Sequence, residues 1–455
     1  MTSPAPTVVP AGPRPRRGTE LLLTAFAVVI AVLAYASVGL AVEDRVPEGT
    51  LGYGAGLVVL FLVAHLAVRR LAPYADPLIL PCVALLNGLG LVMIRRLDFS
   101  AAERAQQLAR ELPRAEAPRQ LVWTAVGIAA FIATLVVVRR TRALEGYRYT
   151  LMFIGIGLLL LPLVPGVGRT INGARIWVSL GPVSFQPGEF AKIVLAVFFA
   201  SYLVEKREVL AMASVRLGPV MLPDLRHFGP VLLAWGASLI VMFYERDLGS
   251  SLLFFAVFVV MLWVATERAS YLAVSMLLFG GGALLAWRVF SHVQVRVDNW
   301  LDPWQDVSGD GFQTVQGTFA LAFGGVTGTG LGLGSPGRIP AAETDFIFAA
   351  IGEELGLAGT TAVLVAFLLM VGTGLRIALQ ADNPFEKLLA AGLTAILGLQ
   401  SFIIMGGVIR LVPLTGITLP FVSYGGSSLV ANYVLLALLM RISDGRDRRE
   451  AERLR

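Results

Sequence analysis

Charged residues are scarce in this chain of 455 residues: Asp, Glu, Lys and Arg make up 15% of it, whereas 56% is hydrophobic. A soluble protein usually carries about 25% charged residues. A chain this apolar cannot cover its own surface with polar groups, so lipid must be the solvent for much of it. We therefore expect a membrane protein.

Cysteine and histidine are scarce as well. The single cysteine, Cys82, excludes an intramolecular disulfide, so nothing here requires an oxidising compartment. The histidines, His65, His227 and His292, are far apart in sequence, which argues against a histidine-based zinc site. The net charge of +6 is modest and comes with no basic cluster on a soluble domain, which argues against nucleic-acid binding.

Long apolar runs, by contrast, are abundant. A membrane span needs about 20 mostly apolar residues. Runs of suitable length lie near residues 20–42, 50–68, 77–95, 120–138, 149–165, 186–204, 228–244, 249–266, 270–289, 346–376, 386–411 and 420–441. This pattern predicts an all-α polytopic membrane protein of about twelve transmembrane helices, with a large loop over residues 290–345.

The basic residues between these runs indicate an orientation. If the spans alternate, most of the basic residues between them fall on one side, which the positive-inside rule identifies as the cytoplasm. These are Arg14, Arg16, Arg17, Arg69, Arg70, Arg139, Arg140, Arg142, Lys206, Arg207, Lys387, Arg446, Arg448 and Arg449. Both termini are then cytoplasmic and the loop 290–345 is outside. Arg95 and Arg96 conflict with the rule, because their mixed-charge loop falls outside.

Ionisable residues within predicted spans are functional candidates, because charge is costly in lipid. Glu189 and Lys192 lie three residues apart at the start of a span and share a helix face. They form either a local ion pair at the interface or a cation held for an anionic headgroup. Arg246 lies in a charged connection, Glu245–Asp247, that a plain polar turn would also explain.

Acids gather where the long loop re-enters the membrane. Asp345 marks the entry, and Glu353 and Glu354 follow about two turns deeper, where a carboxylate needs a cavity or a cation. Helix capping by Thr344 would explain the Thr-Asp pair. It does not explain three acids at and below the membrane surface.

The loop itself carries two weaker patterns. Its aspartates at intervals of four, Asp298, Asp302, Asp306 and Asp310, resemble a calcium loop but lack the EF-hand spacing. Residues Gly332–Gly337 match the string GxGxxG, but no βαβ pattern surrounds them, which excludes a dinucleotide site. The glycines here predict tight turns and close backbone approach instead.

The last span opens on an irregular stretch, Leu419–Ser428, which contains Pro420, Gly425, Gly426 and several hydroxyl groups. Irregular backbone at membrane depth is tolerated only against protein or water. The stretch therefore either lines a cavity or packs closely on another helix.

Seven strings together resemble the SEDS family of shape, elongation, division and sporulation proteins (RodA, FtsW and SpoVE). They occur in family order: Phe185–Lys192, Asp247–Gly249, Leu301–Pro303, Gly311–Gln313, Thr344–Phe348, Glu353–Gly356 and Leu419–Ser428. Some positions depart from the family. Ile176 separates Arg175 from Trp177, Glu343 replaces a histidine, and Ile404 replaces an asparagine.

The resemblance implies a core of ten helices, to which this chain adds an N-terminal hairpin. It predicts a disordered cytoplasmic segment 1–19, the hairpin 20–70, the SEDS-like core 71–443 and a charged cytoplasmic tail 444–455. The departures resemble an actinobacterial branch. The extended N-terminal part resembles RodA-type elongation proteins more than division-specific FtsW-type proteins, which stay the alternative.

The resemblance also implies peptidoglycan glycosyltransferase activity in a bacterial plasma membrane. The family polymerises lipid II, a disaccharide-pentapeptide on undecaprenyl diphosphate, beside a class B penicillin-binding protein that acts as transpeptidase. Asp345 matches the family's essential aspartate. Inversion in a single displacement needs one general base, and we predict that Asp345 is this base.

The leaving diphosphate needs preorganised positive charge. Lys192 is our candidate, together with Arg175 or Arg246, and Glu189 would position Lys192 or contact the acceptor. A divalent cation near Asp345, Mg²⁺ or Mn²⁺, could share this task. The other residues predicted to bind substrate are Glu353, Glu354, Ser423 and Ser427.

Two other functions stay open. A lipid II flippase would explain the spans, the intramembrane charges and the lipid substrate equally well, but it should present polar groups through the whole membrane thickness. A scaffold that only anchors a transpeptidase leaves the three acids unexplained. Purified protein with labelled lipid II in detergent separates these functions, because detergent abolishes flipping but not polymerisation.

Overall fold

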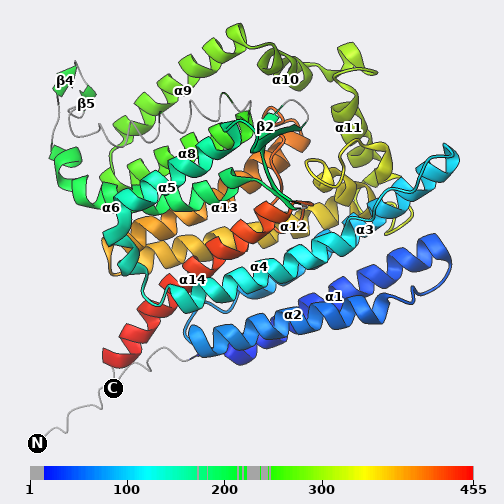
Figure 1. Cartoon of the computed structure of the whole chain (residues 1–455), viewed down its shortest axis with the longest axis horizontal. Coiled ribbons are helices and arrows are strands. Elements are labelled where there is room, and N and C mark those ends of the chain that lie inside the picture. The colour runs from blue at the N-terminus through cyan, green and yellow to red at the C-terminus, as the bar shows by residue number, and fades with distance from the viewer. Residues whose placement is uncertain are drawn as a thin grey trace, which may run out of the picture.

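The structure is a computed structural model that describes residues 15–171, 174–181, 183–212, 215–217, 220–222, 236, 244 and 247–453. The described chain is almost wholly helical (Figure 1). Its α-helices are α1 (Arg17–Glu43), α2 (Thr50–Leu71), α3 (Ile79–Gln107), α4 (Ala117–Val137), α5 (Arg148–Leu160), α6 (Pro187–Met212), α8 (Leu248–Thr266), α9 (Ala269–Val289), α10 (Ser291–Leu301), α11 (Phe312–Gly324), α12 (Ile347–Gln380), α13 (Pro384–Val408) and α14 (Gly426–Arg453).

The remaining elements are short. The strands are β1 (Gly168–Ile171), β2 (Ala174–Leu180), β3 (Val183–Phe185), β4 (Val215–Leu217) and β5 (Val220–Leu222). The first three form an antiparallel sheet in the order β1-β2-β3, and β4 pairs with β5. The 3₁₀ helices are η1 (Thr141–Tyr147), η2 (Leu161–Leu163), η3 (Pro303–Asp306) and η4 (Pro336–Arg338).

Eleven helices among the described residues are long and apolar enough to cross a membrane. This confirms the prediction of an all-α polytopic membrane protein. The run predicted at 228–244 lies outside the described residues, apart from residues 236 and 244, so a twelfth span stays a prediction. Helix α3 continues to Gln107 instead of ending near residue 95, because residues 101–107 are rich in strong helix formers.

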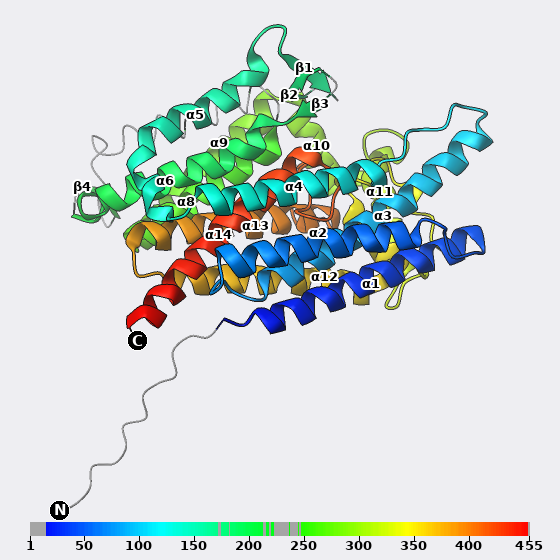
Figure 2. The same ribbon diagram turned by 60° about the horizontal axis from the view of Figure 1, so that its bottom comes forward.

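The hairpin of α1 and α2 lies on one outer side of the bundle, against α3 and α4 (Figure 2), and α9 lies on the other side (Figure 1). The span of α14 is the most enclosed of the described spans, with 94% of its apolar window buried inside the protein, against 11% for α9. Helix α14 is therefore the most enclosed of these helices, whereas most of α9 is uncovered.

A buried polar cluster fixes the hairpin near the start of α1. Glu20 is fully buried, and its Oε1 lies 2.7 Å from Nδ1 of His65 on α2. Arg17 donates to the other oxygen of Glu20 and to the carbonyl oxygens of Pro73 and Ala75 in front of α3. Each buried charge thus has partners, which is the condition for burying it at low cost.

The start of α1 and the last turns of α14 lie on the same side of the bundle. Asp444, in the last turns of α14, accepts a hydrogen bond of 2.9 Å from the backbone N–H of Tyr74. Tyr74 belongs to the same connection that receives Arg17. The opposite side of the bundle carries α10 and α11 (Figure 1).

Helix α12 is broken at Gly356, whose φ is 64°. The backbone groups freed by this break form hydrogen bonds with the glycine-rich run at the end of α11, residues 324–337. Leu357 donates to the Gly325 carbonyl at 2.9 Å, and Thr329 donates to the Glu353 carbonyl at 2.9 Å. A Cβ atom at Gly328 would lie 2.2 Å from the Glu354 carbonyl oxygen. Within the string Gly332–Gly337, Gly332 has φ of 85°, and a Cβ atom there would lie 3.1 Å from the Val38 carbonyl oxygen. The prediction of tight turns and close backbone approach is confirmed at this glycine.

The irregular stretch before α14 packs closely on α3 and α4, so the second of the two predicted alternatives is confirmed. Asn87 of α3 donates to the Phe421 carbonyl at 3.3 Å. Gln120 of α4 donates to the Ser423 carbonyl at 3.1 Å and accepts from the Gly425 N–H at 3.3 Å. Buried amide side chains therefore replace the missing helical hydrogen bonds.

We predict that Gly90→Ala destabilises the protein. A Cβ atom at Gly90 would lie 2.4 Å from the backbone oxygen of Val422, which cannot move without displacing the stretch before α14. Overpacking of this kind costs about 1–3 kcal/mol. The melting temperature in detergent should fall. Gly157→Ala is the control, because no atom lies within 4 Å of its Cβ position; equal melting temperatures for both variants would contradict the prediction.

Candidate functional site

Asp345 lies in the turn that leads into α12, two residues before the helix begins. Its carboxylate is half-buried and accepts a hydrogen bond of 2.5 Å from the hydroxyl of Thr344. Burial raises the pKa of Asp345 above its ordinary value of 3.8, although the Thr344 hydroxyl and the charge of Arg296 act in the opposite direction. Asp345 is thus a carboxylate with increased proton affinity at the end of a span.

Arg296 of α10 is the cation that faces Asp345. A Cβ atom built on Gly416 would lie 3.6 Å from Nη2 of Arg296 and 3.7 Å from Oδ2 of Asp345, so both side chains approach this glycine. Nη1 of Arg296 donates to the Leu414 carbonyl at 3.0 Å. Burial lowers the pKa of Arg296, and the charges of Asp247 and Asp345 oppose this shift.

Asp247 extends this charged group toward α6. Its carboxylate caps the N-terminus of α8 by accepting a 3.0 Å hydrogen bond from the backbone N–H of Ser250. Burial raises the pKa of Asp247, and Glu189 raises it further, whereas Arg296 lowers it. Arg246, predicted to bind diphosphate, lies outside the described residues.

Lys192 and Glu189 form a buried ion pair of 2.7 Å on α6, and each residue is only 6% exposed. Nζ of Lys192 also donates to Oε1 of Gln400 on α13 at 2.7 Å. Gln400 in turn donates to the Thr418 carbonyl at 2.8 Å. The local ion pair that the spacing indicated is therefore present, and contact of Lys192 with an anionic ligand stays a prediction.

Residues 414–425, which we call the 414–425 segment, connect these groups. Ser423 accepts from the Leu419 N–H at 2.9 Å and donates to the Thr344 carbonyl at 2.5 Å, directly before Asp345. The same segment receives Gln400 at Thr418 and Arg296 at Leu414. The 414–425 segment thus forms hydrogen bonds next to Lys192, Arg296 and Asp345 and fixes their positions relative to one another.

Three other residues predicted to bind substrate form hydrogen bonds with backbone groups of the protein itself. Ser423 binds the Thr344 carbonyl, as described, and the hydroxyl of Ser427 accepts from the Gln186 N–H at 2.9 Å. Arg175 lies on β2 and donates to the Val164 carbonyl at 3.3 Å. Substrate binding by Ser423, Ser427 and Arg175 stays a prediction.

Glu353 and Glu354 accept hydrogen bonds from the glycine-rich run, residues 324–337. Glu353 accepts a hydrogen bond of 2.7 Å from the Ser335 N–H. Glu354 is fully buried, and its two oxygens accept from Arg96 at 2.7 Å and from the Gly332 N–H at 3.0 Å. Their contacts explain why carboxylates lie within the span, and also why Arg96 lies on this side against the charge rule. Their role in substrate binding stays a prediction.

The carboxylates near Asp345 do not form a ready-made metal site. In the described ranges no group of three or more His, Cys, Asp or Glu side chains could hold a metal ion. The aspartates of the loop also have local partners. Asp302 accepts from the Trp304 N–H at 3.1 Å, and Asp306 accepts from the Gly309 N–H at 2.9 Å. The donor set does not fit a bound Mg²⁺ or Mn²⁺, and we assign no step to one.

Comparison with known proteins identifies the family. The sequence profile of the FtsW/RodA/SpoVE family, described as cell cycle proteins, matches residues 76–448. The chain belongs to this family. It is 47% identical over 446 residues to the peptidoglycan glycosyltransferase RodA of Mycobacterium tuberculosis, covering 98% of this chain and 92% of the relative.

More distant relatives agree. The probable peptidoglycan glycosyltransferase FtsW of Geobacter metallireducens is 35% identical over 327 residues, which cover 71% of this chain and 84% of that protein. A solved chain described under "Structural coordination of polymerization and crosslinking by a peptidoglycan synthase complex" matches with a TM-score of 0.56 at 26% identity. The match covers 87% of this chain and 98% of the solved chain. The fold of the family thus extends over nearly all of both.

We predict that Arg96→Met destabilises the protein strongly, because it leaves the buried charge of Glu354 without its cation. Breaking a buried pair in this way costs about 3–5 kcal/mol. The double variant Arg96→Met/Glu354→Gln removes the orphaned charge while its amide can still accept from Gly332, so it should recover much of the loss. Melting temperatures in detergent measure both. A double variant no more stable than Arg96→Met would show that the charge of Glu354 is not the cause.

Proposed function

We propose that this protein is a RodA-type peptidoglycan glycosyltransferase, which polymerises lipid II into glycan strands during cell-wall elongation. The observation that carries the proposal is its 47% identity to the mycobacterial RodA over 98% of the chain. The FtsW relative is less similar and covers 71% of the chain. A role in division is therefore the second candidate.

The proposal requires Asp345 to lie on the outer side of the plasma membrane, where the sugar of a lipid-linked donor is exposed. Arg376, near the end of α12, pairs with Asp76 on the side that carries both chain ends, so Asp345, before the start of α12, lies at the opposite side. The positive-inside rule assigns the side with the chain ends to the cytoplasm. Both termini are then cytoplasmic.

The reaction is a single displacement at the anomeric carbon of the donor. The 4-hydroxyl oxygen of the acceptor forms the new glycosidic bond, the bond to the diphosphate oxygen breaks, and undecaprenyl diphosphate leaves with the electron pair. Asp345 takes the hydroxyl proton as general base, a contribution of about 10²–10⁴ in rate. Burial supports this role, because a raised pKa makes the carboxylate a stronger base at neutral pH.

Two cations are available for the diphosphate. The ammonium of Lys192 has three N–H donors, of which one is hydrogen-bonded to Gln400, while Glu189 neutralises its charge at 2.7 Å. Donors therefore remain for a phosphate oxygen. Arg296 uses one N–H on Leu414 and presents further donors beside Asp345. Fixed donors of this kind stabilise charge that develops on a leaving group.

A partner is part of the proposal. The solved chain that matches belongs to a complex described as coordinating polymerization with crosslinking. We infer that this protein likewise works beside a class B penicillin-binding protein, which crosslinks the strands that it makes.

We predict that Asp345→Asn abolishes polymerisation of purified lipid II in detergent, because an amide cannot accept the acceptor proton. Its melting temperature should stay close to that of the wild-type protein. Asp298→Asn, an exposed acid on α10, is the matched control and should retain activity. Near-normal turnover by Asp345→Asn would exclude the general-base role. A wild-type protein that moves lipid II across vesicle membranes without polymerising it in detergent would favour the flippase instead.

We predict that Arg296→Gln moves the acidic limb of the pH profile of kcat/KM to higher pH. The positive charge of Arg296 lowers the pKa of Asp345, so its removal raises this pKa further. The base must be ionised to act, and activity is therefore lost at a higher pH as the pH falls. Arg296→Lys keeps the charge and should keep the limb near its wild-type position. A limb that coincides in all three proteins would contradict electrostatic coupling between the two residues.

A further inference from the structure

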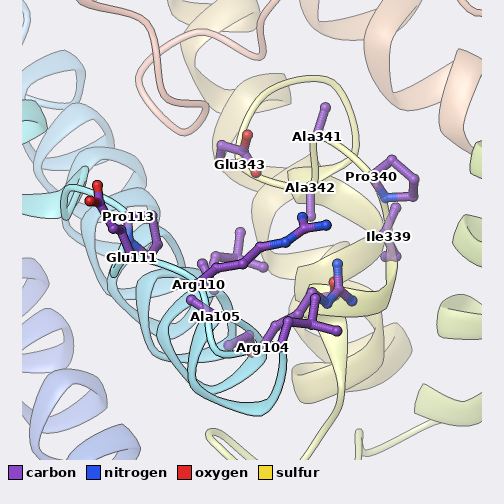
Figure 3. Close-up of a pocket in the computed structure, with 15 residues that line it drawn as sticks. Arg104, Ala105, Arg110, Glu111, Pro113, Ile339, Pro340, Ala341, Ala342 and Glu343 are labelled. Carbon is purple, nitrogen blue, oxygen red and sulfur yellow. The ribbon is translucent and has the colours of Figure 1, made fainter.

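A cavity of about 350 Å³ lies beside the candidate site, at the free end of α3. Its walls are the last turns of α3, the chain that follows to Pro113, and the residues from Gly337 to Glu343 (Figure 3). Most of the lining is small and apolar, and its charged side chains are Arg104, Arg110, Glu111 and Glu343. No function assigned above uses this cavity.

The local backbone directs Arg110 into the cavity. Helix α3 ends at Gln107 and is followed by Ala109, a residue with φ of 50°; the Arg110 N–H donates back to the Ala105 carbonyl at 2.9 Å. A left-handed residue and this backward bond form a helix-terminating turn that reverses the chain. The turn normally uses glycine, and alanine makes it less favourable. The Arg110 side chain extends across the cavity toward Ala342 (Figure 3).

The two arginines of the cavity differ in their partners. Nη2 of Arg104 donates to the Gly337 carbonyl at 2.6 Å, which ties α3 to the opposite wall. Arg110 is exposed, and its side chain has no hydrogen bond or ion pair with any residue that the structure describes. Glu111 points away from the guanidinium groups in the close-up (Figure 3). Arg110 is therefore the group available to an incoming anion.

The cavity adjoins the turn that carries Asp345, and its walls belong to other elements than those of the candidate diphosphate cations. Glu343 lines the cavity two residues before Asp345, so their Cα atoms are at most about 7 Å apart. The cavity is built on α3, whereas Lys192 and Arg296 belong to α6 and α10. Helix α3 packs against α1, α2, α4 and α12.

An inverting displacement needs its two partners on opposite sides of the anomeric carbon. If the diphosphate leaves toward Lys192, the acceptor approaches from the side of Asp345 and can extend toward α3. The acceptor disaccharide carries a pentapeptide on the sugar next to the reacting one, and the C-terminus of this peptide is a carboxylate. An extended pentapeptide spans up to about 17 Å, enough to pass from the sugar at Asp345 into the cavity.

We propose that this cavity binds the pentapeptide of the acceptor and that Arg110 contacts the C-terminal carboxylate. This inference rests on the proposed function. Guanidinium and carboxylate form charge-assisted, often bidentate hydrogen bonds. The apolar lining suits small peptide side chains, and Glu343 is placed to accept peptide N–H groups. Arg110 is thus a residue for acceptor specificity and takes no part in proton transfer.

The test uses the full chain in detergent, with a labelled lipid II donor whose 4-hydroxyl is blocked and an acceptor lipid whose diphosphate is linked through carbon. The blocked lipid can then act only as donor, and the carbon-linked lipid only as acceptor. Amidation of the acceptor's C-terminal carboxylate should raise the KM of the wild-type protein for acceptor by roughly three- to tenfold, the range of a partly exposed charged contact. The kcat should not change.

Arg110→Ala should show the same increase in KM with the free carboxylate and should no longer respond to amidation. Arg110→Lys should recover part of the response. The matched control is Arg114→Ala, an exposed arginine of the same connection that does not line the cavity, and it should behave as wild type.

Several outcomes would overturn the proposal. If Arg110→Ala responds to amidation as the wild-type protein does, Arg110 does not contact the carboxylate. If only amidation of the donor raises KM, the cavity belongs to the donor. Normal polymerisation without any response to amidation would remove this subsite and leave the proposed function intact, whereas no polymerisation by the wild-type protein would remove both.

Discussion

The site depends on one constraint: a carboxylate at the rim of an apolar bundle must keep its charge without a full shell of water. Asp345 meets this constraint through Thr344 and through the charge of Arg296. Arg296 is in turn held by the backbone of the 414–425 segment. Because irregular backbone is stable at this depth only with every polar group paired, the buried amides Asn87 and Gln120 become part of the same construction.

The same rule explains the other buried charges. Arg96 neutralises Glu354 inside α12, and Arg17 and His65 surround Glu20 at the opposite side of the bundle. These groups have structural partners on two or three helices. The cations near Asp345 differ, because Lys192 and Arg296 keep N–H donors beyond those that the described contacts use. This difference separates residues that hold the fold from residues that can receive a substrate.

Much of the architecture is predictable from the sequence, because span length and loop charge follow directly from the chemistry of lipid. Span length and loop charge do not predict the polar end of α3. The helix continues beyond the apolar run because the residues there are strong helix formers. In the site, Asp345, Glu189 and Lys192 are visible as charges in spans. Arg296 is not, because it lies in a polar loop and only the fold brings it to Asp345. A cation five residues before the Leu301–Pro303 string is the one sequence signal that could have found it.

Catalysis by Asp345 requires this residue to face the outside of the membrane, where a lipid-linked sugar can reach it. The most direct measurement is labelling of Ala341→Cys by a membrane-impermeant maleimide in right-side-out vesicles, in a Cys82→Ala background. We expect rapid labelling at residue 341, which is exposed, and labelling of Asp382→Cys, beyond the far end of α12, only after the vesicles are opened. Labelling of residue 341 that required opened vesicles would contradict the account.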